Sequence, residues 1–95
     1  MTNEQQHICA LLEKLRVKYQ FEKEVIYGEF FYTTVDFYLP RYMLCIRIAP
    51  AKNNDDFIRR HLGLYVMRIP KKRYLTAGEL SRMIDGYKIK GIRSR

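Results

Sequence analysis

Clustered cysteines and histidines are missing from this 95-residue sequence, which has two of each and no CxxC pair. A structural zinc site is therefore not supported, because its ligands normally come in closely spaced pairs. Cys9 and Cys45 both stand among apolar residues. We interpret them as buried free thiols of an intracellular protein, rather than as a disulfide or a metal site.

A long hydrophobic run is missing as well. No apolar stretch approaches the roughly 20 residues that cross a bilayer, and the polar start MTNEQQHICALLEKL does not have the pattern of a secretory signal. These absences predict a cytoplasmic protein with no membrane partner. The length predicts a single domain, residues 1–95, because so short a chain has room for one modest core.

Acidic residues are scarce in the second part of the chain. Residues 59–95 contain eleven Lys or Arg and two Asp or Glu, whereas residues 1–58 contain seven and eight. The net charge of +8 is thus concentrated in one part of the sequence. This distribution predicts a polyanionic partner, with nucleic acid first. The alternative is a solvated basic surface that binds nothing specific.

Aromatic and β-branched runs alternate with segments of helical periodicity. An apolar stripe predicts a helix over residues 3–19, capped by Thr2 or Asn3. A second helix ends at Gly63, and a third opens at Thr76 with Glu79 in capping-box spacing and stops at Gly86. The strands are predicted at 21–26, 30–39, 43–49 and 64–70, and a basic C-terminal tail at 88–95. The order αβββαβα predicts an α/β (α+β) fold, with helices packed on a mixed four-stranded sheet.

Asp36 is the one carboxylate inside the aromatic run FFYTTVDFYL. Strand alternation places the odd positions of this run on one face and Asp36 on the other, more polar face. Arg47 lies inside the next strand, LCIRIA. If the two strands form a hairpin, Asp36 and Arg47 can share a face and form a salt bridge, although the sequence leaves the register open.

A longer pattern runs from about residue 21 to residue 75. Its parts are Glu24, then VDFYLPRYMLCI, then RIAP, then DDFIRRHLGLYVMRI. As a whole, the pattern resembles the very-short-patch-repair-like branch of the restriction-endonuclease, or PD-(D/E)xK, superfamily. The resemblance implies a minimal restriction-endonuclease-like core and favours DNA as the nucleic acid. It also suits a phage or mobile-element protein.

The resemblance implies a set of carboxylates for Mg²⁺-dependent cleavage of phosphodiesters. Asp36 matches the first family acid, Glu24 an upstream acid, and Asp55 or Asp56 a later one. Mg²⁺ takes hard oxygen ligands and activates the attacking water. Asp36 and Glu24 are therefore the candidate catalytic residues of an active endonuclease, and Asp36, Asp55 and Asp56 its candidate metal ligands. Asp55 and Asp56 equally suit the start of the second helix.

Three positions depart from the family pattern. Arg47 stands where the family has its second acid, Ala49 and Pro50 replace an acid–glycine turn, and Lys52 lies near the place of a histidine. A guanidinium repels Mg²⁺ and cannot bind it. We therefore expect a nuclease-like domain that has lost its cleavage site and needs no cofactor. Arg47 would then pair with Asp36 or hold a phosphate.

Basic residues form the second candidate site. The predicted nucleic-acid-binding residues are Arg47, Lys52, Arg59, Arg60, Arg68, Lys71, Lys72 and Arg73. Such a density of cations can neutralise several phosphates and make the affinity depend on salt. Tyr65, Tyr74 and Tyr87 lie among them and can stack on bases, although each alone suits core packing equally well. A third hypothesis is a protein-interaction module, in which an aromatic face of the sheet forms a homodimer or binds another protein.

Overall fold

The computed structural model describes residues 1–26, 32–48, 54–70 and 74–93 of the chain. Its elements are α1 (Asn3–Lys14), β1 (Gln20–Ile26), β2 (Tyr32–Leu39), the 3₁₀ turn η1 (Pro40–Tyr42), β3 (Leu44–Ile48), α2 (Asp55–Leu62), β4 (Tyr65–Ile69) and α3 (Ala77–Arg93). The predicted order αβββαβα and the mixed four-stranded sheet are confirmed. No helix in the described ranges is long and apolar enough to span a membrane.

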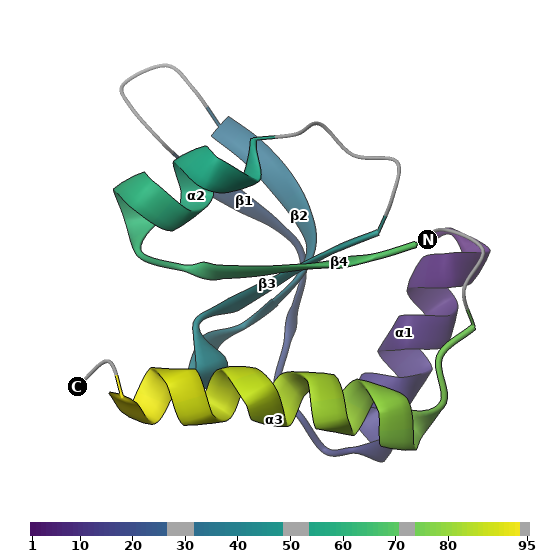
Figure 1. The fold of residues 1–95 in the computed structure, drawn as a ribbon. Coiled ribbons are helices and arrows are strands. Elements are labelled where there is room, and N and C mark those ends of the chain that lie inside the picture. The colour runs from purple at the N-terminus through teal and green to yellow at the C-terminus, as the bar shows by residue number, and fades with distance from the viewer. Residues whose placement is uncertain (27–31, 49–53, 71–73, 94–95) are drawn as a thin grey trace.

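The strands follow one another across the sheet in the order β1-β2-β3-β4. β1, β2 and β3 pair antiparallel, and β4 pairs parallel to β3 after the crossover through α2. Helix α2 covers one face of the sheet, whereas α1 and α3 cover the other (Figure 1). The parallel pair places Arg47 of β3 beside Arg68 of β4.

Two hydrophobic clusters fill the space on either side of the sheet. The larger cluster joins the sheet to α1 and α3, and its strand residues include Phe37, Leu39, Leu44, Ile46 and Ile48. The smaller cluster lies under α2 and consists of Val25, Val35, Cys45, Ile58 and Val66. The predicted alternation of β3 is confirmed, because its even and odd positions fall in different clusters.

β2 changes faces at Asp36. Val35 belongs to the cluster under α2, whereas Phe37 belongs to the cluster against α1 and α3. Regular alternation would place both on one face, so the prediction that all odd positions of this strand share a face is wrong. The register puts Glu22 of β1 across from Asp36, and Glu22 has a left-handed φ of 49°. This local break in the ladder resembles a β-bulge, which re-aims the side chains beyond it.

Local capping signals set several helix ends as predicted. Thr2 caps α1 in a capping box with Gln5, and Thr76 and Glu79 exchange the same pair of hydrogen bonds before α3. Gly63 ends α2 in the left-handed conformation, with a φ of 65°. A residue with a side chain would be strained there.

Two predicted helix ends are wrong. α1 ends at Lys14 rather than near residue 19, because the chain turns at Arg16, which has a φ of 57°. α3 continues through Gly86 to Arg93, so residues 88–93 of the predicted basic tail are helical. Ile84 and Tyr87, on either side of Gly86, both pack on the core. This packing offsets the modest cost of a glycine inside a helix.

Candidate functional site

Asp36 is held between α1 and β3. Its Oδ1 accepts a hydrogen bond of 2.9 Å from Gln5 Nε2, and its Oδ2 accepts one of 2.8 Å from the backbone N–H of Ile48. Gln5 is fixed in turn, because its Oε1 accepts from the N–H of Thr2 at 2.9 Å. The carboxylate therefore ties the first turn of α1 to the carboxyl end of β3 through neutral donors.

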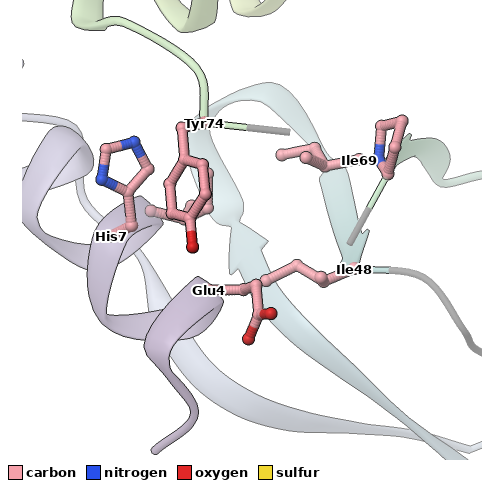
Figure 2. Close-up of a pocket in the computed structure, with 7 residues that line it drawn as sticks. Glu4, His7, Ile48, Ile69 and Tyr74 are labelled. Atoms are coloured by element: carbon pink, nitrogen blue, oxygen red, sulfur yellow. The ribbon is translucent and has the colours of Figure 1, made fainter. Parts of the chain in front are cut away.

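A small pocket lies beside this junction, at the carboxyl ends of the parallel strands β3 and β4. Figure 2 shows Glu4 and His7 from α1 next to Tyr74, with Ile48 and Ile69 opposite them. Its volume is about 10 Å³, which is room for roughly one water molecule. In its present form, the pocket cannot hold a nucleotide.

His7 has a structural role at the rim of this pocket. Its Nε2 lies 2.7 Å from the carbonyl oxygen of Leu75, and a carbonyl only accepts, so Nε2 carries the hydrogen. The ring also meets the edge of Tyr74, with centroids 5.5 Å apart. Both contacts attach α1 to the segment that leads into α3.

Arg47 occupies the other face of the sheet, under α2. Its side chain is 3% exposed, and its Nη1 donates to Asp55 Oδ1 at 3.0 Å and to Asn54 Oδ1. Its Nη2 donates to Thr33 Oγ1 at 3.3 Å. Arg68 approaches Asp55 from the neighbouring strand with two bonds, Nε to Oδ2 at 2.6 Å and Nη2 to Oδ1 at 3.1 Å. Asp55 thus joins the start of α2 to both parallel strands.

The two guanidinium groups determine the charge state of Asp55. Burial alone raises the pKa of this carboxyl, but hydrogen bonds and charge from Arg68 and Arg47 outweigh it and leave the pKa below its ordinary value. Asp55 is therefore a firmly ionised carboxylate at neutral pH. The cluster of Arg47, Asp55 and Arg68 is called the Asp55 clamp below.

The predicted salt bridge between Asp36 and Arg47 is wrong. Asp36 bonds to Gln5 on the α1 side of the sheet, whereas Arg47 bonds to Asp55 on the α2 side. The change of faces in β2 is the physical reason, because it aims Asp36 away from the face that Arg47 shares with Cys45. Arg47 does form a buried ion pair, but with an acid from the next helix.

The described residues do not fit a divalent cation. No group of three His, Cys, Asp or Glu among them is arranged to hold a metal ion. Asp36 and Asp55 accept hydrogen bonds on opposite sides of the sheet, and Asp56 is exposed with Arg59 3.4 Å away. Glu24 is exposed on β1. The structure therefore does not bring the predicted ligands Asp36, Asp55 and Asp56 together.

The predicted nucleic-acid-binding residues differ in their exposure to solvent and in their contacts within the protein. Arg59 and Arg60 are exposed on α2, and the Arg59 guanidinium also donates to the carbonyl of Val66. Arg68 is 31% exposed in the Asp55 clamp. Arg47 is buried, so its proposed contact with a phosphate is not available in this structure. Four further candidates lie outside the described residues: Lys52, Lys71, Lys72 and Arg73.

The three tyrosines that were candidates for base stacking also differ in how far their side chains are exposed. Tyr65 and Tyr87 contact each other with ring centroids 5.7 Å apart and pack on the larger cluster, which agrees with the core-packing alternative. Tyr74 is 68% exposed. Its ring is the one of the three that is open enough to meet a base.

The sequence analysis did not identify Gln5 as a partner of Asp36. The T-x-x-Q spacing from Thr2 to Gln5 is a recognisable capping-box signal, and it predicts the first turn of α1. The same spacing says nothing of Asp36, because their contact joins residues 31 positions apart. Only the folded sheet reveals that Gln5 serves both a helix cap and a strand carboxylate.

Solved nuclease structures share this fold. The catalytic domain of the homing endonuclease I-Bth0305I has a TM-score of 0.61 and 19% sequence identity, over 97% of this chain and 99% of that domain. The 5-hydroxymethylcytosine-specific restriction enzyme AbaSI has a TM-score of 0.52 and 13% identity, over 94% of this chain and 40% of that one. The chain therefore has a restriction-endonuclease-like fold, the fold of these nuclease domains. No protein-family model and no curated protein sequence matches it.

Proposed function

We propose that this chain is a nucleic-acid-binding domain, with DNA as the favoured ligand, that has kept a nuclease fold of the very-short-patch-repair-like branch without its metal-dependent cleavage. It would act as a regulator, as a competitor of a related active nuclease, or as a subunit of a larger complex. The observation that carries the loss of cleavage is the Asp55 clamp. Arg47 stands where the resemblance places an acid, and it holds Asp55 in a buried ion pair.

The state of the two carboxylates supports the same conclusion. Both oxygens of Asp36 accept hydrogen bonds from the protein, and both oxygens of Asp55 accept bonds from arginines. A cation at either site would have to displace these donors. At Asp55 it would also lie beside two positive charges, which disfavour it strongly at short range.

Charge supports the binding half of the proposal. Residues 59–95 carry eleven of the 18 basic residues and two of the ten acidic ones. Arg60 projects from α2 as an exposed cation, and the run Lys71-Lys72-Arg73 follows Pro70 in the sequence. Cations of this density bind phosphates and release counterions, so the affinity should fall steeply with salt.

The first experiment measures binding of a fluorescent DNA duplex across a salt series. Replacing Lys71, Lys72 and Arg73 together by alanine should weaken binding and reduce the salt slope by up to about 3. The matched control replaces Lys14, Arg16 and Lys18, three exposed cations from the other part of the chain. The control should retain most of the affinity. Equal losses in the two triple variants would show that only net charge matters.

The second experiment tests cleavage on the same samples, with Mg²⁺ or Mn²⁺ and a plasmid substrate. We expect no cleavage above background. Cleavage that disappears in Asp36→Ala would contradict the proposal and favour an active Mg²⁺-dependent endonuclease. Its candidate active-site residues would be Glu24, Asp36 and Asp55 or Asp56. If the protein neither binds nor cleaves DNA, the result would favour the protein-interaction module.

A further inference from the structure

Tyr74 presents its ring to solvent from a well-anchored position. At 68% it is the most exposed aromatic residue in the described part of the chain. The next residue, Leu75, is 2% exposed and belongs to the larger hydrophobic cluster. The carbonyl oxygen of Leu75 also accepts the hydrogen bond from His7 Nε2. The backbone beside Tyr74 is therefore held by the core and by α1, although the tyrosine itself is open.

The contact with His7 leaves a face of the Tyr74 ring accessible. The two centroids are 5.5 Å apart, and the ring planes meet at 77°. In such a near-perpendicular pair one ring meets the other with its edge, so the contact covers at most one face of the tyrosine. The contact thus orients the ring without enclosing it (Figure 2). An oriented ring loses little conformational freedom when a planar group stacks on it.

Cations flank this ring in the sequence. Pro70 and Tyr74 both line the small pocket, and the residues between them are Lys71, Lys72 and Arg73. These three lie outside the described residues, but the chain itself limits their distance. Since consecutive Cα atoms are about 3.8 Å apart, each of the three Cα atoms lies within about 8 Å of that of Pro70 or Tyr74. Cations so close can hold the phosphates of a strand whose base meets the tyrosine.

Glu4 favours the base over the phosphate at the ring itself. It lines the same pocket from α1, next to Tyr74 (Figure 2). A carboxylate repels a phosphate at short range, whereas a nucleic-acid base is uncharged. The acid and the nearby cations therefore favour one orientation of a nucleotide, with its base toward Tyr74 and its phosphates toward the basic run.

Stacking on Tyr74 requires a base whose face is open. Inside a duplex, each base is covered on both faces by its neighbours. Such a base could reach the tyrosine only by leaving the stack, which costs unstacking and unpairing free energy. In a single strand the faces are accessible, and an aromatic side chain can stack on any of the bases.

We propose that Tyr74 stacks on an unpaired base, so that this chain binds single-stranded DNA more tightly than duplex DNA. The inference rests on the proposed function, since it names the form of DNA that the chain prefers. His7 is a positioning residue for the ring and does not itself contact the base.

The test measures the affinity of the full chain for a labelled single strand, and for the same strand annealed to its complement, by fluorescence anisotropy across a salt series. Wild type should prefer the single strand. Tyr74→Ala should weaken single-strand binding by about tenfold, whereas Tyr74→Phe, which keeps the ring, should retain it. Stacking releases no counterions, so Tyr74→Ala should leave the salt slope unchanged, unlike the triple substitution of Lys71, Lys72 and Arg73.

Tyr32→Ala is the matched control. Tyr32 is a tyrosine of similar exposure, 63%, but its cross-strand partner is Ile26 and it lies far from the basic run in the sequence. This variant should bind the single strand like wild type. Far-UV circular dichroism verifies that each variant folds.

A spectroscopic measurement reports on the ring directly. The chain has no tryptophan, so Tyr74→Trp introduces a single indole. Stacking on a base should quench its emission, and the single strand should quench it more than the duplex when both are saturating.

The outcomes separate this inference from the proposed function. If neither probe binds, both are contradicted. If DNA binds but Tyr74→Ala binds the single strand like wild type, the stacking role of Tyr74 is overturned and the proposed function survives. Equal losses in Tyr74→Ala and Tyr32→Ala, or a wild-type preference for the duplex, would also overturn the inference.

Discussion

Two aspartates join helices to the sheet, and they do so by different physics. Asp36 lies on the α1 side and accepts hydrogen bonds from an amide and a backbone N–H. Asp55 lies on the α2 side and accepts bonds from two guanidinium groups, one of them buried. Removing Asp36 would leave neutral donors behind, whereas removing Asp55 would leave a buried positive charge. The fold should therefore tolerate the first loss far better than the second.

The largest expected effect is that of Asp55→Asn. It removes the negative charge between Arg47 and Arg68 and should lower the free energy of unfolding by about 3–5 kcal/mol. Urea denaturation measures the change. Asp56→Asn is the matched control, because Asp56 is in the same first turn of α2 but exposed. It should change stability by no more than about 0.5 kcal/mol. Equal effects of the two substitutions would contradict the role given to the Asp55 clamp.

The second prediction is that the Asp55 clamp stabilises the fold less at acidic pH. The folded-state pKa of Asp55 is lowered, so its contribution to stability is fully present above the unfolded-state pKa of about 3.9. That contribution is lost as the pH falls through the folded-state pKa. Arg68→Gln removes the bidentate partner and should bring the pKa of Asp55 back toward its ordinary value.

Thermal melting between about pH 6 and pH 2 measures this difference. The stability that wild type has in excess over Arg68→Gln should be constant at neutral pH and should shrink as the solution becomes acid. If the melting temperature of Arg68→Gln changes with pH in parallel with that of wild type, Arg68 does not control the titration of Asp55.

The order of the elements was predictable because its signals are local. Alternating aromatic and β-branched residues mark β2, Gly63 ends α2, and the pair Thr76 and Glu79 opens α3. Each of these signals acts within a few residues of the structure it determines. The order of the elements then predicted the mixed sheet, and the resemblance to a nuclease family implied the fold that the solved nuclease domains share.

The partners of the two aspartates were not predictable for a different reason. The face to which Asp36 points depends on the break in the ladder beside Glu22, and its partner Gln5 comes from a helix 31 positions earlier. Asp55 suited a helix start equally well in the sequence, and only the crossover through α2 brings it over Arg47 and Arg68. Side-chain pairing across layers is a long-range property, and periodicity carries no information about it.

The smallest expected effect is that of Asp36→Asn. The isosteric amide retains one oxygen, which can accept from Ile48 N–H, but its NH₂ group then faces Gln5 Nε2, so the bond to Gln5 is lost together with the charge. The free energy of unfolding should fall by about 1–2 kcal/mol. Gln5→Ala removes the other side of the contact, and the double variant should lose less than the sum of the two singles, since both substitutions remove one shared hydrogen bond. A loss at Asp36 as large as the loss at Asp55 would mean that the α1 junction also depends on charge.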